Sequence, residues 1–97
     1  PVRDWLLDLD KADRQAIGTD IQTVEFGWPI GMPVCRLMGG GLYEVRTNIS
    51  SKRIARVLFC IKGNQMVLLH GFIKKSQNTP KPDLALAKVR YREVQHD

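Results

Sequence analysis

The 97-residue sequence has no long hydrophobic run, and this absence excludes a membrane-spanning protein. Its longest apolar stretches, at residues 57–61 and 66–69, are far shorter than the roughly 20 residues that a transmembrane helix needs. A signal-peptide pattern of basic start, apolar middle and small-residue cleavage site is also missing. We therefore expect no membrane partner and a cytoplasmic location. The chain begins at Pro1 rather than at Met, which is consistent with the loss of upstream residues.

Cysteine is scarce, and the few metal-ligand side chains are scattered. Cys35 and Cys60 have neither the spacing of a zinc site nor the density of a disulfide scaffold, and Cys60 lies inside an apolar run. We expect both to be reduced core residues. Because no cluster of carboxylates or of His and Cys has metal-ligand spacing, a metal-dependent nuclease is disfavoured and we expect no cofactor.

Acidic residues are rare in the second half of the chain. Residues 46–97 hold eleven basic against three acidic residues, a net charge of +8, whereas residues 1–45 hold four basic against seven acidic, a net charge of −3. A segregated positive half raises the local concentration of polyanions. Nucleic acid, or an acidic protein segment, is therefore the leading class of partner, and a basic surface that serves only solubility is an equal alternative on charge alone.

The spacing of apolar residues predicts helices first and strands afterwards. From Pro1 to about Phe26 they recur mostly every three or four residues, which predicts two amphipathic helices, the second capped by Asp10. Two prolines in residues 27–33 end that helical layer. The period then changes to two, which predicts strands at residues 34–38, 42–47, 53–61 and 65–74.

Tight turns between these strands imply antiparallel neighbours. Thr79 and Pro80 supply a cap and a first-turn proline for a final helix. The apolar stripe of that helix consists of Leu84, Ala87, Tyr91 and Val94. We therefore predict one α+β domain over residues 1–97, in which a small antiparallel sheet is packed by two N-terminal helices and a C-terminal helix.

Side chains alternate across a strand, so the last three strands divide into two faces. One face is apolar and is expected to pack under the N-terminal helices: Tyr43, Val45, Thr47, Ala55, Val57, Phe59, Ile61, Val67, Leu69, Gly71 and Ile73. The other interrupts apolar residues with charge: Glu44, Arg46, Asn48, Ile54, Arg56, Leu58, Cys60, Met66, Leu68, His70, Phe72 and Lys74. We predict that Arg46, Arg56 and His70 converge there in a cationic hollow with Phe72 at its rim.

Such a group of side chains suits RNA cleavage without a metal, in which a ribose 2′-hydroxyl attacks the adjacent phosphate. The reaction needs a base for the hydroxyl proton, cations for the charge of the transition state and an acid for the leaving oxygen. Arginine grips phosphate oxygens in pairs, and histidine can take or give a proton. Glu44 can serve as the base or orient a neighbouring arginine.

Each residue also has a simpler interpretation. Glu44 and Arg46 can form an exposed ion pair of little energetic value. Arg56, inside an apolar strand, requires a buried partner or an anionic ligand, because an unpaired charge there is costly. A lone histidine such as His70 is more often structural than catalytic, and Phe72 is more often core than a base-stacking platform. The coincidence of the charged residues on one face favours the catalytic interpretation.

Three segments resemble the phage-derived branch of the RelE/HigB toxin family: residues 42–46 (LYEVR), 55–59 (ARVLF) and, most specifically, 69–80 (LHGFIKKSQNTP). The resemblance implies ribosome-dependent cleavage of mRNA, inhibition by a cognate antitoxin that is often a helix-turn-helix protein, and growth arrest by the free toxin. It also implies the RelE-like microbial RNase fold, which usually has a strand before the first helix. That strand is absent here, so either the chain is a fragment or the missing edge of the sheet is completed in another way.

The resemblance also assigns roles to residues. It implies that Arg46 contacts phosphate, that Arg56 is the arginine of the central strand, and that Lys74 and Lys75 close the site. Some relatives carry a tyrosine after this basic pair, whereas residues 76–82 contain none, so His70 or Lys75 becomes the candidate proton donor. The predicted catalytic set is Arg46, Arg56, His70 and Lys75, and the predicted substrate-binding set is Glu44, Lys52, Arg53, Phe72 and Lys74.

Three hypotheses follow from the sequence. The first is the toxin of a type II toxin-antitoxin system, an mRNA endoribonuclease that inhibits translation, for which Arg56→Ala is expected to abolish toxicity without unfolding the domain. The second is a basic module that binds RNA or the ribosome without cutting. The third is a decayed toxin that only binds its antitoxin as a regulator.

Overall fold

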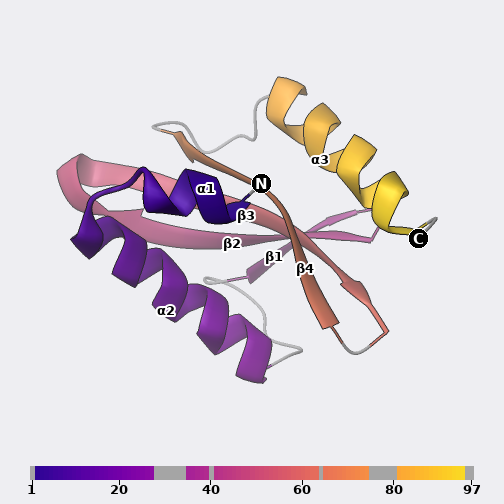
Figure 1. Cartoon of the computed structure of the whole chain (residues 1–97), viewed down its shortest axis with the longest axis horizontal. Helices are drawn as coiled ribbons and strands as arrows, with labels where there is room; N and C mark the ends of the chain where they lie inside the picture. Colours follow the sequence, from indigo (N-terminus) through magenta and orange to yellow (C-terminus); the bar gives the residue numbers. More distant parts are fainter. Residues whose placement is uncertain (1, 28–34, 40, 64, 75–80, 96–97) are drawn as a thin grey trace.

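The computed structural model describes residues 2–27, 35–39, 41–63, 65–74 and 81–95, and for residues 35–37, 39, 51 and 74 the backbone alone. Helices and strands follow the predicted order (Figure 1). They are α1 (Val2–Leu7), α2 (Lys11–Gly27), β1 (Cys35–Gly39), β2 (Leu42–Ile49), the 3-10 turn η1 (Ser50–Lys52), β3 (Arg53–Lys62), β4 (Gln65–Lys74) and α3 (Lys81–Gln95). The predicted α+β class is confirmed.

The four strands form an antiparallel meander in the order β1-β2-β3-β4. Their bounds agree with the sequence pattern because glycine breaks the pattern where the chain turns. Gly41 and Gly63 adopt φ values of 88° and 62°, in the left-handed region that glycine enters without steric cost. The Thr79-Pro80 cap and the predicted loop beyond Gly27 lie outside the described residues.

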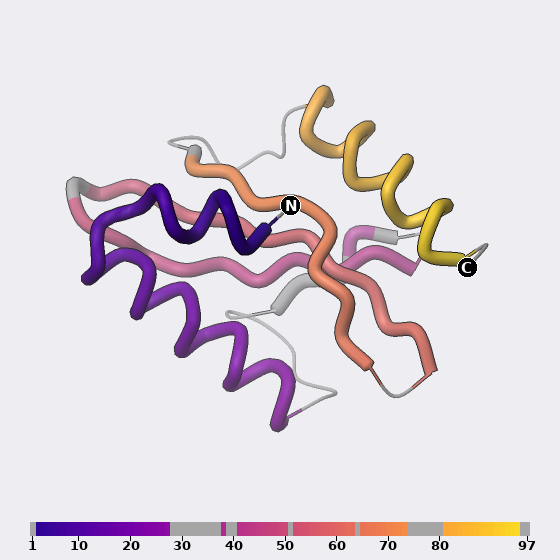
Figure 2. The backbone as a smooth tube through the Cα atoms, in the orientation of Figure 1, coloured from indigo at the N-terminus to yellow at the C-terminus, as the bar shows by residue number. Residues whose placement is uncertain are grey.

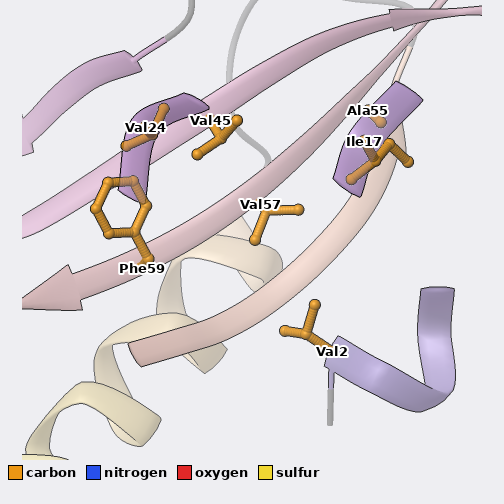
Figure 3. Close-up of a cluster of buried hydrophobic side chains, with 7 residues drawn as sticks. All are labelled: Val2, Ile17, Val24, Val45, Ala55, Val57 and Phe59. Atoms are coloured by element: carbon orange, nitrogen blue, oxygen red, sulfur yellow. The ribbon is translucent and has the colours of Figure 1, made fainter. Parts of the chain in front are cut away.

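The two N-terminal helices cover one face of the sheet, which we call the α1/α2 face (Figures 1 and 2). Its buried cluster joins apolar side chains from α1, α2, β2 and β3, which point toward one another in Figure 3: Val2, Ile17, Val24, Val45, Ala55, Val57 and Phe59. Gly71 allows Trp5 of α1 to pack closely against β4, since a Cβ at Gly71 would overlap the Trp5 ring. The predicted core face is therefore confirmed for β2 and β3.

The prediction for β4 is wrong over residues 66–69. Leu58 pairs with His70 and Phe59 with Leu68, so Leu69 is an extra residue that bulges from the ladder. A bulge shifts the alternation by one residue. Met66 and Leu68 consequently join the α1/α2 face, whereas Val67 and Leu69 lie with α3 on the other side.

Helix α3 covers the opposite face, which we call the α3 face (Figure 1). The predicted stripe of α3 is confirmed: Leu84, Tyr91 and Val94 pack against Leu42, Cys60 and Leu69, and Ala87 packs with Leu58 and Phe72. Cys60 is a free, buried thiol, as expected, whereas the side chain of Cys35 lies outside the described part. None of the described helices is both long and apolar enough to cross a membrane.

Candidate active site

The strand register places the predicted charged residues on one face of the sheet. Arg46 of β2 lies opposite Arg56 of β3, which in turn lies opposite Phe72 of β4. The next row joins Glu44, Leu58 and His70 in the same way. The sheet therefore places Arg46, Arg56 and His70 on the same face, in two adjacent rows and on three successive strands, and α3 packs over part of that face.

Arg56 and Glu44 form an ion pair that is wholly removed from water. Both side chains are 0% exposed, and Arg56 Nη1 lies 3.3 Å from Glu44 Oε1 and 3.4 Å from Oε2. The burial of Arg56 within an apolar strand required a partner or a ligand, and the partner is Glu44. The alternative of an exposed pair between Glu44 and Arg46 is wrong, because Glu44 is buried.

Arg46 differs from Arg56 in that its charge is not matched by a carboxylate in the described part of the chain. The side chain is half-buried, and its Nε is out of water with no hydrogen-bond partner among the described residues. Arg56 lies opposite Arg46 in the register, but Glu44 already balances its charge. The partly exposed Arg46 is therefore the arginine of this row that is suited to binding a phosphate.

His70 is held by two residues of α3. Its Nε2 lies 2.6 Å from Asp83 Oδ1, and its Nδ1 lies 3.4 Å from Arg90 Nη1, which also donates to the carbonyl of the bulged Leu69 at 2.8 Å. The ring stacks on Phe72 with centroids 5.7 Å apart. Unlike the Glu44–Arg56 pair, this cluster reaches the surface: the side chains of His70 and Asp83 are 16% and 28% exposed.

The remaining predicted residues are spread along the same end of the sheet. Arg53 donates to Asp13 at 3.0 Å, and Ser50 binds the same buried carboxylate, which fastens α2 to the turn between β2 and β3. Lys52 is exposed in that turn. Lys74 ends β4, but its side chain lies outside the described part, as does the whole of Lys75.

Sequence reasoning missed Asp83 and Arg90. The usable signal was their spacing of seven residues on the predicted helix, which places both on one side, next to the apolar stripe. Nothing in the sequence indicated that His70 would lie between them. Across the described residues, no three His, Cys, Asp or Glu side chains form a group that could hold a metal ion.

The fold and this charged face define a small α+β protein with arginine and histidine side chains on one side of an antiparallel sheet. A family model described as "Phage derived protein Gp49-like (DUF891)" matches residues 4–92. Because the match covers most of the chain, the protein belongs to this family, which is one of RelE/HigB-like toxin-type proteins. The comparison with curated proteins found no match.

Proposed function

We propose that this protein is the toxin of a type II toxin-antitoxin system, within the RelE/HigB branch, and that it acts in the cytoplasm as a metal-independent, ribosome-dependent mRNA endoribonuclease. Membership of a toxin-type family supports this proposal. The observation that carries it is Arg46, a partly exposed arginine on the charged face that forms no ion pair with another described residue. A phosphodiester that approaches from solvent would supply the opposite charge.

The proposed reaction needs only side chains of the protein. A base takes the 2′-hydroxyl proton, the 2′-oxygen bonds to phosphorus, and the bond from phosphorus to the 5′-oxygen breaks. An acid protonates the leaving oxygen, which gives a 2′,3′-cyclic phosphate and a 5′-hydroxyl end. Arg46 binds the phosphate and stabilises its added charge. His70 moves a proton, and Lys75 is our candidate acid.

The buried pair has a supporting part in this proposal. Glu44 balances the charge of Arg56 in a pair that is out of water, so Arg46 is left to supply the positive charge of this row of the sheet. Phe72, Lys52, Arg53 and Lys74 are the further substrate-binding candidates. The partners are mRNA on the ribosome and a cognate antitoxin, which we expect to be a helix-turn-helix protein.

A second candidate function is a module that binds RNA or the ribosome without cutting. The observation in its favour is that Arg56 and His70 each already hold a carboxylate, Glu44 and Asp83. Binding by Arg46 alone would then suffice. The two candidate functions differ in whether new RNA 5′ ends appear.

Mapping of mRNA 5′ ends after induction tests the proposal. The wild-type protein is expected to create new 5′-hydroxyl ends inside translated messages, and Arg46→Met to abolish them. Arg3→Met is the matched control, because Arg3 is an exposed arginine of α1 away from this face. Growth arrest without new ends would favour the binding module. The absence of both growth arrest and new ends would favour a decayed toxin.

Arg56→Ala is a poor first test of the proposal, because it also breaks a buried ion pair.

A further inference from the structure

The hydrogen-bond partners of His70 favour one tautomer of its imidazole ring. Arg90 Nη1 lies 3.4 Å from Nδ1, and a guanidinium only donates, so this contact is a hydrogen bond only when Nδ1 accepts. Asp83 Oδ1 lies 2.6 Å from Nε2, and a carboxylate only accepts, so Nε2 must carry the hydrogen. Both contacts are satisfied together only in the neutral Nε2–H tautomer, whose lone pair is on Nδ1.

The bulge in β4 makes these contacts possible. Leu69 and His70 are consecutive residues, yet both lie toward α3: Leu69 is buried with Leu84 and Tyr91, and His70 binds Asp83. A regular strand would send one of them to the opposite face. The carbonyl of Leu69, released from the ladder, accepts a hydrogen bond from Arg90. The bulge thus aims His70 at the helix and fastens the helix beside it.

We infer that Asp83 is a positioning residue for the proposed cleavage, in which it holds His70 with the Nδ1 lone pair ready to take the 2′-hydroxyl proton. This inference rests on the proposed function. Asp83 does not touch RNA; it acts through the imidazole by accepting from Nε2–H and by stabilising the charge that the ring gains with the proton. The substrate hydroxyl replaces Arg90 as the donor to Nδ1, while Arg90 keeps its hydrogen bond to the carbonyl of Leu69.

The ring hydrogen can be located without RNA. The chain has two histidines, so a His96→Gln background leaves His70 as the single imidazole for nitrogen-15 NMR. We expect Nε2–H in this background when the ring is neutral, and loss of that preference in Asp83→Asn, whose amide can donate to Nε2. The inference would be overturned if the neutral ring of His70 carried its hydrogen on Nδ1 in the His96→Gln protein, in which Asp83 is intact.

Cleavage on programmed ribosomes then links the tautomer to the reaction. Asp83→Asn is expected to slow cleavage about 100-fold, the usual range for a positioned acid or base. Added to His70→Gln, it is expected to slow cleavage no further. Glu93→Gln, the same acid-to-amide change at an exposed position of α3, is the matched control and should cleave at the wild-type rate.

The outcomes separate a positioning role from a structural one. An equal slowing by Asp83→Asn with and without His70, or no slowing, would contradict the inference. If Asp83→Asn lowers the melting temperature, Asp83→Glu supplies the test, since it keeps the carboxylate and should keep both the tautomer and most of the activity. A wild-type chain that cuts no message would instead refute the proposed function, and the inferred role of Asp83 with it, whatever tautomer NMR reports.

Discussion

The two faces of the sheet differ in what holds them together. The α1/α2 face is a cluster of buried apolar side chains, whereas the α3 face buries Glu44 and Arg56 at 0% exposure and places Arg46 and His70 beside them. An apolar cluster is stable when its side chains bury enough apolar area and fit together in shape, whereas buried charges need specific partners. Substitutions on the first face should therefore change stability alone, and those on the second should separate stability from activity.

The largest effect on stability is expected at Phe59, on the α1/α2 face. Its ring is 0% exposed and stacks on Tyr43 at 5.4 Å, so Phe59→Ala should lower the free energy of unfolding by about 3–5 kcal/mol. Urea unfolding gives the value. Phe26→Ala is the control, because Phe26 is 85% exposed and its loss should change the free energy by under about 0.5 kcal/mol. Similar losses for both variants would contradict the assignment of the core.

On the α3 face, a four-member cycle tests the buried ion pair. Arg56→Met and Glu44→Leu should each lower the free energy of unfolding by about 3–5 kcal/mol, because each strands the other charge away from water. The double variant should recover most of that loss, since it buries no charge at this position, yet it should cleave no RNA. A double variant less stable than either single one would show that the pair is not the dominant interaction of these two residues.

The sequence predicted the apolar face better than the charged one. Alternation placed Val45, Val57 and Phe59 correctly, because a half-buried strand has a period of two whatever its neighbours are. The same rule failed at residues 66–69, because a bulge depends on the pairing of two strands. For Arg56 the argument from burial correctly required a partner, but only the register identifies Glu44. The contacts of Asp83 with His70 depend on how α3 docks, which no local pattern encodes.

A smaller effect is expected for the clamp between α2 and the turn that joins β2 to β3. Arg53 is 30% exposed in its side chain and bonds to Asp13, so Arg53→Ala should lower the free energy of unfolding by about 1 kcal/mol. Ser50 still binds Asp13, which limits the loss. The same variant also tests the predicted substrate-binding role of Arg53: a cleavage rate that falls more than about 10-fold with intact stability would support that role over the clamp alone.

The smallest effect on stability is expected at Cys60, whose reactivity shows whether the apolar part of the α3 face is closed to solvent. Burial raises the pKa of its thiol above the ordinary value, and nearby Lys62 lowers that pKa in part. The folded state therefore keeps the thiol protonated at pH values where the unfolded chain loses its proton, so this residue reduces stability as pH rises past the ordinary thiol pKa. In a Cys35→Ser background, iodoacetamide at pH 8 should react slowly before urea is added and rapidly afterwards. Equal rates would show that Cys60 is accessible.

The rate of message cleavage by purified Arg46→Met on programmed ribosomes tests the central claim most directly. The account predicts a fall of at least about 100-fold relative to Arg3→Met. It also predicts a nearly unchanged free energy of unfolding, because Arg46 forms no ion pair with another described residue. Cleavage by Arg46→Met at the rate of Arg3→Met would contradict the claim that Arg46 binds the scissile phosphate.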